Sequence, residues 1–237
     1  MRFAMNISMT LIGQATVVID IDGLVFMTDP WWGSFEFLRA VPLPINPETI
    51  NPIHYMLVSH NHIDHWCNRA IELAKARDCQ VIGSTKAVRR AQKKGVKNIQ
   101  ALTPGESIHC NGVKVSAVPA FHPFAKDAIG FIIQKSTATI YFSGDTLYNE
   151  FLHKALTPYS VTIAMIQIAC STYPLIGKDG MDMEAATRFV DEVKPHIVIP
   201  IHYHVKGKYV TKQDLGNWSI SAKKIILEHG VKTNVSL

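Results

Sequence analysis

The sequence predicts an α/β protein in which sheets are covered by helices. Three continuous apolar runs, at residues 53–59, 161–168 and 196–201, have the composition of strands that are buried on both faces. Segments with helical signals follow strands in both halves of the chain, which is the order expected for sheets with helical layers. Hydrophobic residues make up 47% of the 237 residues and charged residues 18%, as in a globular protein.

The first third of the chain has the pattern of short strands joined by turns. Its apolar runs are ISMTLI, TVVIDI and LVFMTD, and Asp22-Gly23 between the last two is a strong hairpin signal. Residues 30–48 contain four prolines and four aromatic residues, so we expect a long ordered loop there. Its aromatic side chains could form a lid over a ligand or pack the loop onto the sheets.

Helices are expected at four places along the remaining sequence. The first covers residues 68–77, and the second begins after Ser84, a good N-cap residue, once the short strand QVIG has passed. The others lie around residues 182–193 and near 217–229, the last before a final short strand. Between them, SIHC, VKVSAVPA, AIGFIIQK and ATIYFSG are expected to be strands. We treat residues 1–237 as one domain.

Composition narrows the functional classes. No run approaches the ~20 apolar residues of a membrane-spanning helix, and the start of the chain has no secretory signal pattern. The four cysteines are scattered without a CxxC pair, so we expect a reducing cytoplasmic location. The net charge of +5 weakly favours an anionic substrate. The basic run RRAQKKGVK is better explained as the solvated face of a helix than as a nucleic-acid site.

The segment SHNHIDHW, residues 59–66, carries the strongest functional signal. It places His60, His62, Asp64 and His65 directly after the buried strand at 53–59. Helical zinc sites space their histidines four apart, whereas residues two apart in extended backbone point the same way. His60 and His62 can therefore share one ion, while Asp64 and His65 can turn toward a second. The alternative is a surface cluster of histidines without a metal, or a role for Asp64 as the N-cap of the next helix.

The pattern His-x-His-x-Asp-His resembles the metallo-β-lactamase superfamily, and the resemblance extends over nearly the whole chain. Further matching motifs follow in order: VPAFHP with His122, IYFSGDT with Asp145, and IVIPIHY with His202. The opening LIGQATVVIDIDGLVFMTDP also resembles the first hairpin of the family and contains Asp29. GQAT, TDP and GMDMEAA are similar to the branch with L-ascorbate-6-phosphate lactonase and N-acyl-phosphatidylethanolamine-hydrolysing phospholipase D. This chain is much shorter than those two enzymes, so their substrates do not transfer.

The resemblance implies a four-layer αβ/βα sandwich of two mixed sheets covered by helices, an α/β fold that some schemes class as α+β. It also implies a ligand set for two divalent metal ions, with Zn²⁺ favoured and Mn²⁺, Fe²⁺ or Ni²⁺ as alternatives. One ion would be held by His60, His62 and His122, the other by Asp64, His65 and His202, and Asp145 would bridge them.

The implied function is a metal-dependent hydrolase in which a metal-bridged hydroxide cleaves an ester-type bond: a lactone, carboxylic ester or phosphodiester. Asp64 and Asp145 are the catalytic candidates. The expected partner is a small or medium, anionic small-molecule substrate, without nucleic acid, and a homo-oligomer is left open. Asp29 could hold a histidine tautomer or be a simple turn residue, and His204 could be a general acid or an ordinary strand-end histidine.

Three other functions are weighed against this hydrolase. An RNA-processing nuclease of the same superfamily would carry a protruding arm, further histidine motifs and a basic aromatic strip, which the sequence lacks. An iron redox protein of the flavodiiron type would have glutamate at His62 and an added flavin domain. A metal-binding interaction protein without activity is disfavoured because the ligand set is complete.

Overall fold

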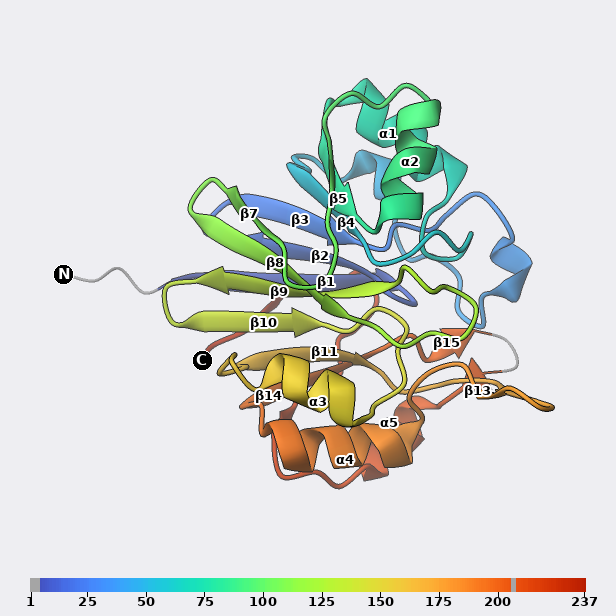
Figure 1. Cartoon of the computed structure of the whole chain (residues 1–237), viewed down its shortest axis with the longest axis vertical. Coiled ribbons are helices and arrows are strands. Elements are labelled where there is room, and N and C mark those ends of the chain that lie inside the picture. Colours follow the sequence, from blue (N-terminus) through green and yellow to red (C-terminus); the bar gives the residue numbers. More distant parts are fainter. Residues whose placement is uncertain (1–4, 206–207) are drawn as a thin grey trace.

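Two seven-stranded sheets pack face to face between layers of helices in the computed structural model, which describes residues 5–205 and 208–237 (Figure 1). Strand order in the first sheet is β18 (Thr233–Asn234), β1 (Ile7–Gly13), β2 (Thr16–Ile21), β3 (Leu24–Thr28), β4 (Tyr55–Val58), β5 (Gln80–Gly83) and β6 (Ile99–Ala101). Strand order in the second sheet is β17 (Lys223–Lys224), β14 (Ile197–Ile201), β11 (Ile163–Gln167), β10 (Ala138–Phe142), β9 (Ile129–Lys135), β8 (Val113–Pro119) and β7 (Ser107–Cys110).

Both sheets are mixed. The hairpins β1–β2–β3 and β7–β8–β9–β10 are antiparallel, whereas β3 to β6 and β10, β11, β14 and β17 pair in parallel. Figure 1 shows α1 (Asn68–Ala76) and α2 (Thr85–Lys93) on the outer side of the first sheet. On the other side, α3 (Glu150–Leu156), α4 (Met183–Val193) and α5 (Lys212–Asn217) cover the second sheet. The predicted αβ/βα sandwich is confirmed.

Short elements fill the connections. The loop at residues 30–48 contains the 3₁₀ turns η1 (Glu36–Leu38) and η2 (Pro47–Thr49). Two small hairpins lie apart from the main sheets: β12 (Thr172–Tyr173) with β13 (Gly177–Lys178), and β15 (His204–Val205) with β16 (Lys208–Tyr209). None of the helices in the described residues is long and apolar enough to cross a membrane.

β4 shows why some strands are apolar at every position. Tyr55 and Leu57 point into the core between the two sheets, while Met56 and Val58 point into the core beneath α1 and α2. Because side chains alternate between the two faces of a strand, a strand with cores on both sides needs a continuous apolar run. The strand therefore ends where its first polar residues, Ser59 and His60, begin.

The helices α1, α2 and α4 lie where the sequence patterns predicted them, whereas α3 was not predicted. Oδ1 of Asp182 accepts a hydrogen bond from the backbone of Ala185, which caps α4. The helix predicted near residues 217–229 is wrong: α5 ends at Asn217. Beyond it the backbone follows β14, with Lys223 N donating to His196 O at 3.0 Å and Ile225 N to Val198 O at 2.9 Å. An edge strand of a sheet has unpaired backbone N–H and C=O groups. A short segment can pair with these groups as a strand instead of forming a helix.

Parallel strands place the functional loops at one edge. β4, β11 and β14 all run in parallel within their sheets, so the residues that follow them emerge at the carboxyl ends of the strands. His60 follows β4 and His202 follows β14, and the two sheets bring these ends together across the sandwich. The fold therefore gathers motifs from distant parts of the chain.

Candidate metal centre

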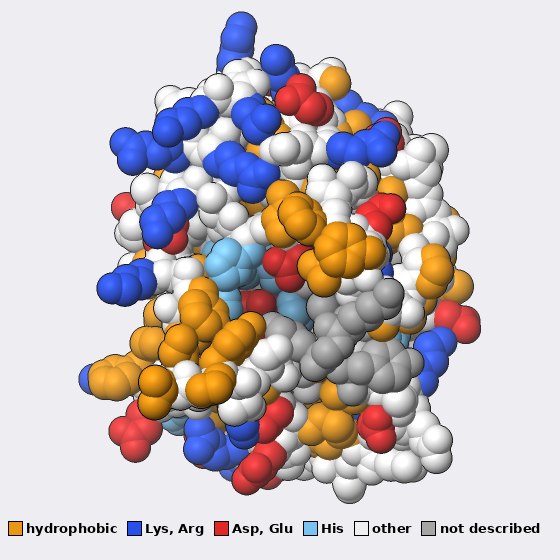
Figure 2. All heavy atoms as spheres, turned by 90° about the vertical axis from the view of Figure 1, so that its right-hand side faces the viewer, with side chains coloured by type: hydrophobic (Ala, Val, Ile, Leu, Met, Phe, Trp, Pro, Cys, Tyr) orange, Lys and Arg blue, Asp and Glu red, His pale blue; other side chains and the backbone are white. Residues whose placement is uncertain are grey.

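The structure brings all seven predicted donor residues into one cluster. Four come from the turn after β4, and His122, Asp145 and His202 come from loops that follow β8, β10 and β14. Two triads of donor atoms form among these seven residues, and the atoms of each triad lie within 4.8 Å of one another. Asp29 forms a third such group with His60 and His65. Figure 2 shows histidine and carboxylate side chains together in a hollow on this face of the molecule.

The first triad consists of His60, His62 and His122. Nε2 of His60 lies 3.0 Å from Nδ1 of His62, and Nε2 of His122 lies 3.3 Å from the same atom. His60 and His122 are buried and His62 is partly exposed. The backbone carbonyl of Asp179 accepts a hydrogen bond from Nδ1 of His122 at 2.8 Å, which leaves its Nε2 lone pair directed at the triad.

The second triad consists of Asp64, His65 and His202. Nε2 of His65 lies 3.2 Å from Nε2 of His202 and 3.7 Å from Oδ2 of Asp64. The two imidazole rings are stacked, at an interplanar angle of 16°. Both histidines are buried, whereas the side chain of Asp64 is 27% exposed, so solvent reaches this triad past the carboxylate.

Asp145 is the buried carboxylate of the cluster. Its Oδ2 lies 3.3 Å from Nε2 of His65, and its Oδ1 lies 3.4 Å from Nε2 of His202. Its charge also acts on His60 and His122 of the first triad. The turn before it depends on Gly144, whose φ is +56° and where a Cβ would lie 2.6 Å from Cβ of Ser59. Only glycine lets this loop approach the end of β4 so closely.

Asp29 ties the cluster to the first sheet. Its Oδ2 lies 2.8 Å from Nδ1 of His65 and accepts a hydrogen bond from Oγ of Ser59 at 2.6 Å. Its Oδ1 accepts from the backbone N–H of Ser59 at 2.7 Å. A carboxylate on Nδ1 orients the ring and directs Nε2 toward the other donors. Asp29 thus has the contact expected of a residue that holds a histidine tautomer.

Gln14 is a site residue that the sequence reasoning did not single out. Its Nε2 donates a hydrogen bond to Oδ2 of Asp64 at 2.8 Å and lies 2.7 Å from Nε2 of His202. The GQAT motif marked this turn, yet nothing in the motif alone indicates where the amide points. Gln14, Asp29 and His202 all have positive φ, at 55°, 35° and 58°. Left-handed backbone in residues other than glycine tends to gather at functional sites.

The two triads differ in the direction in which the pKa values of their histidines are shifted. Burial opposes a charge on His65, but the carboxylates of Asp145, Asp64 and Asp29 outweigh it and hold the pKa of His65 well above its ordinary value. Burial and the neighbouring charge of His65 hold the pKa of His60 well below the usual value. The first triad therefore consists of neutral imidazoles, which are the form that binds metal ions.

The donor set fits divalent cations. Imidazole and carboxylate are common ligands of zinc, and imidazole nitrogens that face one another at 3.0–3.3 Å can all direct lone pairs at one ion. Oδ1 of Asp145 is buried and has no hydrogen-bond partner among the described residues. A buried carboxylate oxygen without such a partner is unfavourable unless a cation lies beside it.

His204 lies outside both triads. Its Nδ1 is 3.0 Å from Nε2 of His229, and its backbone carbonyl accepts a hydrogen bond from the backbone of Ala40. Burial and the charge of His229 lower the pKa of His204 to about 4. This pairing joins the loop at 30–48 to the C-terminal part of the chain, so the structure favours a structural role for His204.

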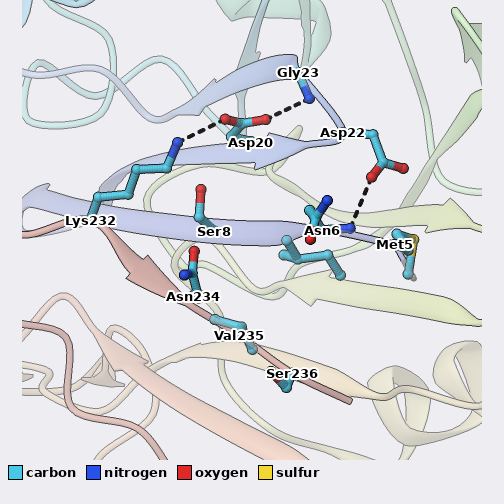
Figure 3. A pocket seen from close by; sticks show the side chains of 11 residues that line it. Met5, Asn6, Ser8, Asp20, Asp22, Gly23, Lys232, Asn234, Val235 and Ser236 are labelled. Carbon is cyan, nitrogen blue, oxygen red and sulfur yellow. Dashed lines mark hydrogen bonds and ion pairs between the residues drawn. The ribbon is translucent and has the colours of Figure 1, made fainter. Parts of the chain in front are cut away.

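Another hollow, of about 390 Å³, lies away from the cluster (Figure 3). It is lined by the start of β1, the β2–β3 turn and β18, whereas Gln14 follows the opposite end of β1. Its carboxylates already have partners: Asp20 pairs with Lys232 at 3.0 Å, and Asp22 accepts from the backbone of Asn6 at 2.9 Å. These paired groups leave the histidine cluster as the candidate site.

The four-layer fold and the histidine-aspartate cluster at one sheet edge are those of a metal-dependent enzyme, and the relatives named below are metal-dependent hydrolases. A family model described as "Beta-lactamase superfamily domain" matches residues 25–203. Because the match covers most of the sequence, the chain belongs to this superfamily. The narrower branch suggested by the GQAT and TDP motifs stays a prediction.

Curated relatives carry names of the same class. The chain is 32% identical over 168 residues to the UPF0173 metal-dependent hydrolase of Nanoarchaeum equitans, covering 66% of this chain and 73% of that protein. It is 23% identical over 236 residues to a UPF0173 metal-dependent hydrolase of Methanopyrus kandleri, covering 93% of this chain and 96% of that protein.

Solved structures share the fold. Igni18, a metallo hydrolase from Ignicoccus hospitalis, superposes with a TM-score of 0.80 at 20% identity, over 98% of this chain and 99% of that one. An isothiocyanate hydrolase from Delia radicum gut bacteria gives 0.82 at 22% identity, over 95% and 98% of the chains. CmlA, a diiron β-hydroxylase from Streptomyces venezuelae, gives 0.71 at 15% identity over 55% of its length. The same fold is thus found with hydrolytic and with oxidative metal chemistry.

Proposed function

We propose that this metal-dependent hydrolase binds two divalent ions, with zinc as the favoured metal, and cleaves an ester-type bond in a small-molecule substrate. The observation that carries the proposal is the pair of donor triads, each within 4.8 Å, with the buried carboxylate of Asp145 against the second and its charge acting on the first. Two ions ~3.5–4 Å apart are typical of such hydrolytic sites. Lactones, carboxylic esters and phosphodiesters are the candidate substrates.

Each triad would hold one ion. His60, His62 and His122 would bind the first, Asp64, His65 and His202 the second, and Asp145 would set their separation. When bound, divalent ions lower the pKa of water toward neutrality and polarise a carbonyl or phosphoryl oxygen.

The chain's own residues would organise this chemistry. Asp29 and the carbonyl of Asp179 fix the tautomers of His65 and His122 through hydrogen bonds of 2.8 Å. Asp64 is the partly exposed carboxylate of the cluster and lies where solvent enters. It can therefore accept the proton of the attacking water, in addition to its role as a ligand. The buried histidines exclude bulk water from the other side.

Metal analysis and a substrate panel test the proposal. Inductively coupled plasma mass spectrometry of the purified protein should return close to two ions per chain. Turnover should then be measured with bis-p-nitrophenyl phosphate and with a panel of lactones and p-nitrophenyl esters. Asp145→Ala should lose metal and turnover together, and full activity in that variant would exclude the bridging role.

Two results would redirect the assignment. Iron in the purified protein, with oxygen consumption and no hydrolysis, would indicate oxidative chemistry of the kind named for CmlA. Cleavage of structured RNA, with no turnover of the small esters, would indicate a nuclease instead. A reproducible absence of bound metal after growth in supplemented medium would end the hydrolase proposal.

A further inference from the structure

We propose that the metal centre opens onto an apolar subsite that binds an acyl chain or aryl ring of the substrate. Its residues are Phe124, Tyr173 and Leu175, which lead outward from the first triad. The inference rests on the proposed hydrolase function and names its substrate class, which is esters that carry an apolar acyl or aryl group.

Phe124 connects the subsite to the metal centre. Its ring centroid lies 5.9 Å from that of His122, with the two rings nearly perpendicular at 84°. Phe124 thus packs against a donor of the first triad, yet it remains 45% exposed. A group bound at this triad lies within reach of an open aromatic ring.

The hairpin of β12 and β13 extends this apolar surface away from the donors. The ring of Tyr173 packs edge-to-face on Phe124, with centroids 4.9 Å apart. At the tip, Leu175 is fully exposed and Ile176 is 53% exposed. Contiguous apolar side chains that are left open to water are a common sign of a binding surface. Here the surface begins at a candidate metal ligand and leads outward.

Phe35 and Phe37 form a second pair of exposed aromatic side chains. Their rings lie 5.9 Å apart, and the side chains are 52% and 67% exposed. Phe37 lies in the η1 turn and Phe35 is its N-cap, and the turn ends at the buried Arg39, on which the charge of Asp64 acts. Figure 2 shows hydrophobic side chains on two sides of the hollow that contains the histidine and carboxylate groups. A substrate bound at the donors would extend between these two sides.

The chemistry of these side chains selects the substrate class. Aromatic and aliphatic groups gain free energy by removing apolar surface from water, and they offer little to the hydroxyl groups of a sugar. In Figure 2 the Lys and Arg side chains of the described residues stand mostly toward the edges of the face. Arg39 is buried and donates to the backbone carbonyl of Trp31. An acyl or aryl group therefore fits these apolar walls better than the hydroxyl groups of a sugar.

A chain-length series tests the subsite on the full-length, metal-loaded protein. Hydrolysis of p-nitrophenyl acetate, butyrate and hexanoate should show kcat/KM rising tenfold or more from acetate to hexanoate. Phe124→Ser and Leu175→Ser should reduce this ratio to threefold or less. Leu237→Ser removes an exposed leucine near β18, at the far end of the molecule, and should leave the ratio unchanged.

The outcomes separate the subsite from the hydrolase function. Hydrolysis with equal kcat/KM for all three esters would overturn the subsite and leave the function standing. If no ester is cleaved, the function is in doubt, and calorimetric titration with methylphosphonate and hexylphosphonate tests the subsite by itself. Tighter binding of hexylphosphonate that is lost in Phe124→Ser supports the subsite, and equal affinities overturn it.

Two other occupants of the apolar surface are distinguished by further measurements. Co-sedimentation with phosphatidylcholine vesicles reports a membrane contact, and analytical ultracentrifugation reports self-association. If Leu175→Ser abolishes either of these and leaves the chain-length ratio at the wild-type value, the surface is an interaction face and the subsite proposal is overturned.

Discussion

The side-chain amide of Gln14 donates a hydrogen bond of 2.8 Å to Oδ2 of Asp64, 50 residues further along the chain. The same nitrogen lies 2.7 Å from Nε2 of His202, 188 residues away. The amide of Gln14 therefore contacts two of the three donors of the second triad, although Asp64 and His202 lie far apart in the sequence.

Gln14→Ala should weaken binding of one ion while the other stays bound. Loss of a residue that orients metal ligands typically costs about 10–100-fold in affinity, and the first triad has no contact with Gln14 among the described hydrogen bonds. Zinc titration in competition with a chelator measures both affinities. Gln100→Ala is the control, because that exposed amide bonds only to the backbone of Ala101. Two ions bound with wild-type affinity would refute the role of Gln14.

Asp29→Asn should reduce metal affinity through His65. The amide can still accept from the backbone of Ser59, but it carries no charge and no longer fixes the ring of His65 as a carboxylate does. We expect about a 10–100-fold loss of affinity and, in the metal-free protein, a lower pKa for His65, because one of the three carboxylates that raise it is gone. Calorimetry and NMR titration of the imidazole signals measure the two effects. Asp20→Asn, beside Lys232, should change neither.

Gly144→Ala should destabilise the fold more than Gly105→Ala. Both glycines have positive φ, so alanine at either position costs roughly 1–2 kcal/mol for the backbone alone. A Cβ at Gly144 would also lie 2.6 Å from Cβ of Ser59, whereas nothing lies within 4 Å at Gly105. Crowding of this kind adds about 1–3 kcal/mol. Urea unfolding of the two variants measures the difference. Equal losses of unfolding free energy would show that the loop at Gly144 accommodates the added Cβ without strain.

His229 should make the protein less stable in acid. Burial and the charges of Lys212 and Arg39 lower its pKa in the folded protein to about 4, from an ordinary value of 6.5. Between these values the unfolded chain binds a proton that the folded protein does not, so stability falls as the pH drops from 6.5 toward 4. His229→Gln should lessen this loss, measured as unfolding midpoints at pH 7 and 4.5. His196→Gln, at an exposed histidine, serves as the control, and an equal effect of both variants would contradict the prediction.

Much of the metal centre could be predicted because its donors follow apolar strands. His60 and His202 come directly after runs that are hydrophobic at every position, and such runs are recognisable without any tertiary information. The spacing within SHNHIDHW also indicated that His60 and His62 can share one ion while Asp64 and His65 turn toward a second. The same local logic failed at residues 217–229, where no helix forms and Lys223–Lys224 pairs with β14 as the edge strand β17.

The chain alone determined which residues can act as ligands, where the buried strands end, and that helices cover the sheets. Only the tertiary structure decided that Gln14 reaches Asp64, that the carbonyl of Asp179 orients His122, and that the exposed ring of Phe124 lies 5.9 Å from that of His122. The direction of a side chain within its own strand follows from local periodicity. The ligand candidates and the ends of the buried strands could therefore be predicted from the sequence. Contacts between segments separated by 50 residues or more depend on how two sheets pack and twist, and no local pattern encodes that geometry.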